Sequence, residues 1–183
     1  MILLPPKVKT KVLRRKNNKT FDNEKDAYNY ALTLLNYRDY SIAEMQEKLK
    51  KCSVSDADIK AVTDKLCGYG FLDEKRYALR VYDSWLAKKY YGKGYLKNTL
   101  QKRSVDDEII NEVAGLVEAD AEIERCCAAA DSYIKKKKIN SFEDAMKVKA
   151  GLGRFLFARG FSVDLIKKTI AEKISYSGVD NYD

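Results

Sequence analysis

One short pattern occurs three times along this chain of 183 residues. In each copy a leucine is followed five positions later by Val or Phe, and then at once by Ser or Asp. The copies are Leu49 with Val54 and Ser55, Leu100 with Val105 and Asp106, and Leu156 with Phe161 and Ser162. Ser or Asp at this place caps a helix by accepting a hydrogen bond from a free backbone N–H, and the preceding Val or Phe packs onto the new helix. The pattern predicts a helix, a tight turn and a second helix, and such repeats usually offer surfaces rather than catalytic pockets.

Apolar residues at helical spacing extend each copy of the pattern into a three-helix unit. The chain has only two prolines and nine glycines, which argues against a loop-rich or all-β protein. We therefore expect an all-α protein of three tandem, helix-turn-helix-like three-helix repeats in an elongated curved array. The expected ranges are a flexible basic arm at 1–22, units at 23–70, 71–117 and 118–175, and a tail at 176–183.

Local signals predict where several helices begin and end. Expected caps are Asp22 or Asn23, Ser41 in a capping box with Glu44, and Asp73. Gly68 is expected as the left-handed residue that ends the third helix, and residues 91–94 as a loop in the second unit. In the third unit Ile123, Cys127, Ala130 and Ile134 mark the expected first helix. Gly151 and Gly153 each weaken the next helix by about 1 kcal/mol relative to alanine, which allows a kink or break there.

Composition excludes several classes of protein. The chain has no histidine, and its four cysteines form no Cys-x-x-Cys pair, so catalytic triads and His-based metal sites are excluded. We expect the cysteines to be buried thiols, and we expect no enzyme activity, no cofactor and no small-molecule substrate. No apolar run approaches the roughly 20 residues that a membrane span needs, so we expect a soluble, cytoplasmic protein.

The formal net charge of +8 is concentrated at the N-terminus. The first 20 residues carry seven cations and no acid, and the remainder has 28 basic against 27 acidic residues. These seven are Lys7, Lys9, Lys11, Arg14, Arg15, Lys16 and Lys19. They suit electrostatic steering or loose phosphate binding, and the alternative is a solubilising tail. Val8, Thr10 and Val12 alternate as in a short strand, but a mobile segment is the preferred interpretation.

Two acid-free stretches outside the arm are candidate partner-binding surfaces. The first, between Ser84 and Val105, also contains Tyr90, Tyr91 and Tyr95, as expected of a surface that meets acids or phosphates. Its cations are Lys88, Lys89, Lys93, Lys97, Lys102 and Arg103, and those of the second stretch are Lys147, Lys149, Arg154 and Arg159. The alternative for both is a solvated face over packed aromatic residues.

Three motifs in order resemble the RecX family, whose members regulate the RecA recombinase. They are RDYS at 38–41 followed by Glu44, Lys48 and Leu49, GFLDEKRYA at 70–78, and RFLFARGFS at 154–162. The resemblance covers about 23–174 and implies a crescent of three three-helix repeats in the groove of the RecA filament on single-stranded DNA. It also implies that ATP hydrolysis, strand exchange and cleavage of the SOS repressor are lowered, without catalysis by the regulator itself.

The chain departs from the family pattern at two turns. Ser53 and Ser104 stand where glycine is common before the apolar residue of the turn, whereas Gly160 keeps it. If the position needs positive φ, serine there costs about 1 kcal/mol, or the turn takes another form. Glu74 stands where a second aspartate is usual, which still suits the first turn of a helix.

A DNA-binding protein that acts independently of RecA is the competing hypothesis, because helix-turn-helix units with basic faces are common among transcription factors. Such a protein would prefer a duplex sequence. The near-neutral body argues against strong DNA binding by the repeats alone.

Overall fold

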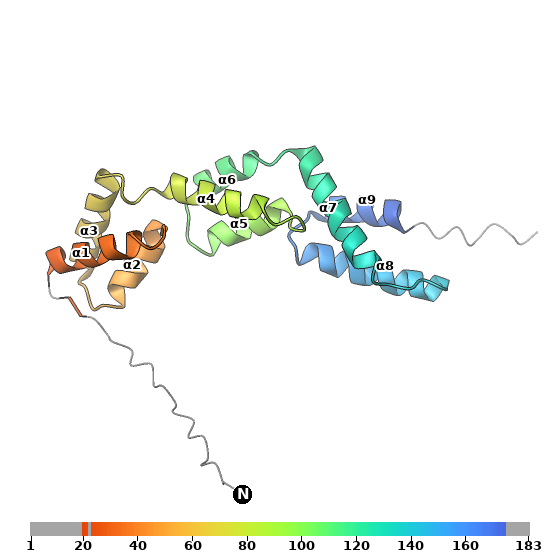
Figure 1. Ribbon diagram of the computed structural model, residues 1–183, viewed down its shortest axis with the longest axis horizontal. Coiled ribbons are helices and arrows are strands. Elements are labelled where there is room, and N and C mark those ends of the chain that lie inside the picture. The colour runs from red at the N-terminus through yellow and green to blue at the C-terminus, as the bar shows by residue number, and fades with distance from the viewer. Residues whose placement is uncertain (1–19, 22, 175–183) are drawn as a thin grey trace, which may run out of the picture.

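The computed structural model describes residues 20–21 and 23–174, and within them the chain forms nine α-helices and no strand. The helices are α1 Glu24–Leu35, α2 Ile42–Lys50, α3 Asp56–Gly68, α4 Glu74–Leu86, α5 Lys93–Gln101, α6 Asp107–Gly115, α7 Ala119–Ile134, α8 Phe142–Phe157 and α9 Val163–Lys173. They follow one another along an elongated molecule, with α1 and α9 near opposite ends (Figure 1). The predicted all-α array of three-helix units is confirmed.

Each group of three helices has its own apolar core. The helix pairs with extensive contacts all lie within α1–α3, α4–α6 or α7–α9. Met45 and Leu49 lie in the core of the first group, Leu96 and Leu100 in the second, and Leu152 and Leu156 in the third, all fully buried. The helices of different groups are therefore connected mainly through loops and helix ends.

The repeated pattern forms the same turn in all three units. Ser53, Ser104 and Gly160 have φ values of 59°, 51° and 81°, so the position requires the left-handed region in each copy. The next residues are Val54, Val105 and Phe161, and all three are buried. The caps Ser55, Asp106 and Ser162 then accept hydrogen bonds from backbone N–H groups in α3, α6 and α9. The predicted helix–turn–helix repeat is confirmed, and its two serines occupy a conformation that favours glycine.

Some local predictions were wrong. The left-handed residue after α3 is Gly70, with φ 71°, because Gly68 still belongs to the helix. Lys93 and Gly94 lie in the first turn of α5 rather than in a loop. The helix predicted from Ile123 to Ile134 is confirmed as α7, which buries Cys126, Ala129 and Ala130 and leaves Ile123 45% exposed.

Helix α8 continues through both of its glycines without a break. A Cβ at Gly151 would lie 2.2 Å from the hydroxyl oxygen of Tyr133 on α7. The glycine therefore serves close packing between α7 and α8, and burial of the helix outweighs its low helix propensity. Among the described residues no helix is long and apolar enough to cross a membrane.

Candidate partner-binding surface

The first and second units meet at a group of charged side chains. Glu44 on α2 is the centre of this first joint, because its carboxylate accepts hydrogen bonds from Arg38 at 3.2 Å and from Arg103. It also completes the predicted capping box with Ser41. The Ser41 hydroxyl is fully buried and donates to the Arg103 carbonyl oxygen at 2.8 Å. A second ion pair joins Asp39 to Arg80 of α4.

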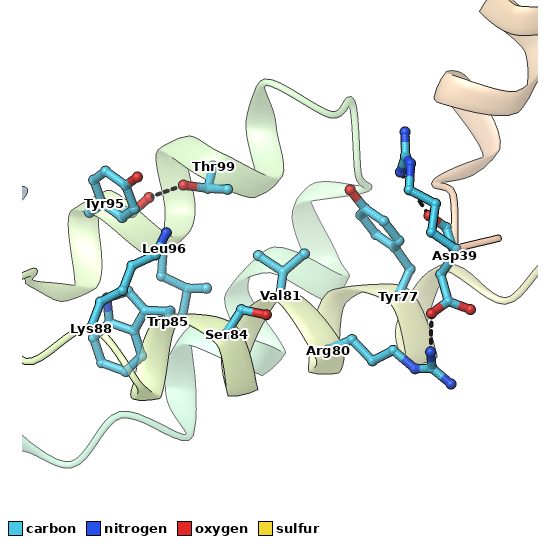
Figure 2. A pocket seen from close by; sticks show the side chains of 11 residues that line it. Asp39, Tyr77, Arg80, Val81, Ser84, Trp85, Lys88, Tyr95, Leu96 and Thr99 are labelled. Carbon is cyan, nitrogen blue, oxygen red and sulfur yellow. Dashed lines mark hydrogen bonds and ion pairs between the residues drawn. The ribbon is translucent and has the colours of Figure 1, made fainter.

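A notch of about 300 Å³ opens beside this joint, between α4, α5 and the loop that precedes α2 (Figure 2). Its lining residues are Arg38, Asp39, Tyr77, Arg80, Val81, Ser84, Trp85, Lys88, Tyr95, Leu96 and Thr99. Burial raises the pKa of the Tyr77 phenol above its usual value. The nearby Asp39 carboxylate also raises this pKa, and the Arg38 guanidinium opposes the shift. The notch therefore combines aromatic walls with cations at both ends, but Arg80 is already paired with Asp39 (Figure 2).

The first predicted cation cluster extends from the end of α4 to the end of α5. Lys88 lies with its Nζ 5.1 Å from the centroid of the Tyr95 ring, and Lys89 is exposed beside it. Lys97 donates to Asn111 at 3.0 Å. Lys93 lies in the first turn of α5, and Lys102 is exposed at its C-terminal cap.

Arg103 differs from these lysines because Glu44 of the first unit already binds its guanidinium. The tyrosines of the segment also differ in exposure. Tyr91 and Tyr95 pack on each other with ring centroids 4.3 Å apart, whereas Tyr90 is 42% exposed. Of the three, Tyr90 is thus the ring most accessible to a partner.

The second predicted cluster is divided between a helix surface and a packed joint. Lys147 and Arg154 are exposed on α8, where Lys147 pairs with Glu143 at 2.7 Å, and Lys149 is half-buried. Arg159 instead stacks on Phe155, with its Cζ 3.5 Å from the ring centroid, and reaches toward Tyr91 of the second unit. The structure therefore keeps Lys147, Lys149 and Arg154 on one helix and places Arg159 between units.

Two direct backbone–backbone hydrogen bonds lie at this second joint. The Gly92 N–H donates to the Arg159 carbonyl and the Gly94 N–H to the Gly160 carbonyl, each at 2.9 Å. The Lys93 N–H donates to the Glu122 carboxylate, also at 2.9 Å. The third unit thus satisfies the free N–H groups at the start of α5, which has no side-chain cap of its own.

The interpretation from sequence missed Arg38, Arg80 and Arg125. Arg125 of α7 donates to the Leu86 and Lys88 carbonyls at 2.7 and 2.6 Å, and it covers the Trp85 ring at 4.1 Å. Burial lowers the pKa of its guanidinium. Single arginines among acids give no signal of this kind in a sequence, because their partners come from other units.

The seven cations of the basic arm lie outside the described residues. In the described part of the chain, no cluster of Cys, Asp or Glu is suited to a metal ion, and all four cysteines are free thiols. Burial raises the pKa of the Cys126 thiol, which suits a core residue rather than a nucleophile.

These features define an all-helical repeat protein whose candidate sites are charged outer surfaces. Residues 27–66 match the family model described as RecX, first three-helix domain. The Regulatory protein RecX of Acinetobacter baylyi is 32% identical over 142 residues, covering 76% of this chain and 83% of that protein. The chain belongs to the RecX family.

Two further comparisons concern length and fold. The Regulatory protein RecX of Bacillus licheniformis is 30% identical over 152 residues, which cover 82% of this chain but only 56% of that relative. The chain thus matches little more than half of this longer protein. The crystal structure of RecX from Lactobacillus salivarius is 24% identical, with a TM-score of 0.70, and the match covers 81% of this chain and 95% of that one. This likeness shows the same fold.

Proposed function

We propose that this chain is a non-catalytic regulator that binds the RecA filament on single-stranded DNA and lowers its ATPase, strand-exchange and coprotease activities. Membership of a family named for regulation supports the regulatory role. The observation that carries the proposal is the elongated array of three units, each with its own core and outer surface (Figure 1). Such an array suits a polymer, because several weak contacts along a filament add up to strong binding.

We further propose the ranges 23–70, 71–117 and 118–175 as the separate contact modules, with residues 1–22 as a basic arm. The lysines between the end of α4 and the C-terminal cap of α5, of which Lys88, Lys89 and Lys102 are exposed, and the cations of α8 are the proposed contacts with filament acids or DNA phosphates. Salt-sensitive attraction of this kind mainly raises the rate at which the two proteins associate and orients them, and it contributes less to the final affinity. The proposed place of action is the cytoplasm, where recombination and the SOS response take place.

The first test is the rate of ATP hydrolysis by RecA on single-stranded DNA with increasing amounts of this protein. We expect inhibition. Inhibition far below one regulator per recombinase would favour capping or disassembly, whereas inhibition near stoichiometric amounts would favour coating of the groove. An unchanged ATPase rate at saturating protein would contradict the proposal.

A charge variant tests the lysine surface itself. We expect Lys89→Gln/Lys93→Gln/Lys102→Gln to raise the concentration for half-inhibition about tenfold at low salt, with a smaller effect at high salt because the attraction is screened. The matched control is Lys135→Gln/Lys136→Gln/Lys138→Gln, which removes the same charge after α7. Equal effects of both variants would indicate general charge rather than a defined surface. Sequence-preferring binding to duplex DNA without RecA would instead support the independent DNA-binding hypothesis.

A further inference from the structure

The outer face of α8 carries a line of apolar residues exposed to solvent. Met146, Ala150, Gly153 and Phe157 are spaced four, three and four apart, which places them on one side of the helix. Met146 is 51% exposed and Phe157 is 66% exposed, and Ala150 between them is also exposed. The opposite face, with Val148, Leu152 and Leu156, forms the core of the third unit. Helix α8 is therefore apolar on both sides.

The other two units show that the fold does not require this exposed line. Leu49, Leu100 and Leu156 occupy the same place in the repeated turn, so the residues that follow them correspond. Phe157 corresponds to Lys50 on α2 and Gln101 on α5, and Gly153 corresponds to Gln46 and Lys97. Helix α8 is also longer, with 16 residues against nine in each of the others. Large exposed apolar groups of this kind mark interaction surfaces.

Cations border the apolar line on both sides. At 100° per residue, Lys149 lies along one edge and Arg154 along the other. Within the described part of the chain neither forms an ion pair, whereas Glu143 and Lys147, which lie on the same side of the line as Arg154, are paired with each other. The face thus presents apolar contacts between two free positive charges, and it complements a surface with apolar side chains flanked by acids.

A protein surface fits this face better than nucleic acid or a second copy of the chain. Binding of single strands relies on aromatic rings that stack on successive bases, and of the four residues of this line only Phe157 offers a ring. Pairing of two α8 faces would bring Lys149 and Arg154 against equal charges, which is unfavourable. An amphipathic segment or groove with acidic edges satisfies both the apolar and the charged groups.

We propose that Met146, Ala150, Gly153 and Phe157, with Lys149 and Arg154 at the edges, form the docking face for an acidic, apolar-bearing surface of a protein partner. The inference rests on the proposed function, and it identifies that partner surface as part of the recombinase protomers rather than the DNA. The third unit then anchors the array through apolar contact, while the lysines that follow α4 and those on and after α5 supply longer-range attraction.

The test compares the wild-type chain with Met146→Gln/Phe157→Gln in binding to RecA filaments on single-stranded DNA. Glutamine already stands at the equivalent exposed position of α5, so the unit is expected to fold. We expect at least tenfold weaker filament binding, with an unchanged Tm and unchanged binding to bare single-stranded DNA. Tyr37→Gln/Leu116→Gln, which removes two exposed apolar side chains elsewhere, is the control and should bind like wild type.

A charge variant examines the edges of the same face. Lys149→Glu/Arg154→Glu should weaken filament binding most at low salt, and Lys149→Arg/Arg154→Lys should restore it. If the wild-type chain binds filaments and Met146→Gln/Phe157→Gln binds them equally well, the docking face is wrong, but the proposed function stands. Loss of bare DNA binding, or a change in sedimentation from dimer to monomer, would overturn it in favour of nucleic acid or self-association. Failure of the wild-type chain to bind filaments would overturn the proposed function, and this inference with it.

Discussion

The two joints between the units use different kinds of interaction. At the first joint, two carboxylates of the first unit pair with arginines of the second, Glu44 with Arg103 and Asp39 with Arg80. Arg38 of the first unit also pairs with Glu44. The arginine side chains are 43 to 64% exposed, so water and salt screen these pairs. Ser41 adds one buried hydrogen bond to a backbone carbonyl of the second unit.

At the second joint the backbones themselves are in contact. Two N–H groups of the second unit donate to carbonyls next to the turn of the third unit, and three glycines make this approach possible. A Cβ at Gly92, Gly94 or Gly160 would come within 2.7 Å of an atom across the joint. Trp85 also lies here and donates from Nε1 to the Gly92 carbonyl at 3.1 Å.

This difference indicates that the two joints differ in flexibility. The second joint also holds the charged side chains of Arg125 and Glu122, but both of these bind backbone groups. Contacts between backbones have fixed geometry and are insensitive to salt, whereas two long charged side chains keep their pairing over a range of angles. We therefore expect the second and third units to move as one body and the first unit to bend relative to them. For the proposed filament binding, the first joint is therefore the place where we expect the array to bend.

The largest expected effect comes from Gly160→Ala. The residue has φ 81°, and a new Cβ would lie 2.1 Å from the Tyr95 backbone nitrogen. Strain and overpacking together should lower the free energy of unfolding by about 3 kcal/mol. Urea unfolding, followed by circular dichroism and by fluorescence of the one tryptophan, Trp85, measures the loss and its location.

Gly115→Ala is the matched control for that substitution. Gly115 lies in α6, and its Cβ would meet no atom within 4 Å, so alanine should be neutral or stabilise by up to about 1 kcal/mol. If Gly160→Ala were as stable as wild type, the close backbone contact at the second joint would be wrong.

A smaller effect is expected from Glu44→Gln at the first joint. Glutamine keeps the capping box but removes the negative charge shared by Arg38 and Arg103, so stability should fall by about 1 kcal/mol. The difference from wild type should shrink as salt rises from low to 0.5 M, because screening already weakens the wild-type pairs. Thermal unfolding at several salt concentrations measures both quantities.

Glu47→Gln provides the comparison on the same helix. Glu47 is exposed and, among the described residues, pairs with Lys51 of its own unit, so its loss should change stability less and leave the joint intact. A salt dependence equal to that of Glu44→Gln would show that the first joint has no special charge network.

The sequence was sufficient for the units but not for the joints. Leucine, buried Val or Phe, and a capping Ser or Asp form one local pattern, so each turn and its helices followed from neighbouring residues. The joints depend on pairs such as Glu44 with Arg103 and Gly94 with Gly160, which lie 59 and 66 positions apart and share no local pattern. Their partners become visible only when the units are placed in space.

The candidate surface shows the same limit. Counting cations predicted Arg103 and Arg159 as contacts, yet one is bound by an acid of another unit and the other is stacked between units. The glycines of α8 similarly suggested a break, because the sequence gives the cost of glycine in a helix but not the burial of α8 or the Tyr133 side chain that packs against Gly151. Exposed residues such as Lys89, Lys102 and Arg154 stay predicted contacts.

The smallest effect on stability is expected at the repeated turns, which hold Ser53, Ser104 and Gly160. Gly160 adopts positive φ without a Cβ, whereas Ser104, next to the first joint, adopts φ 51° with one, and Ser53 does so within the first unit. Serine in this conformation costs about 1 to 2 kcal/mol, which a substitution by glycine would remove. Glycine also gives the unfolded chain more conformational freedom, and this offsets part of the stabilisation. We therefore expect Ser104→Gly and Ser53→Gly each to stabilise the protein by about 0.5 kcal/mol in urea unfolding.

Ser104→Ala and Ser53→Ala separate this backbone effect from the loss of a hydroxyl group. Alanine retains the Cβ and hence the strain, so neither alanine variant should be more stable than wild type. If glycine and alanine behave alike at both turns, strain is not stored there, and the family's preference for glycine at this position needs another cause. If glycine stabilises at Ser53 but not at Ser104, the serine turn beside Arg103 is part of the first joint, because Ser41 holds the carbonyl that precedes it.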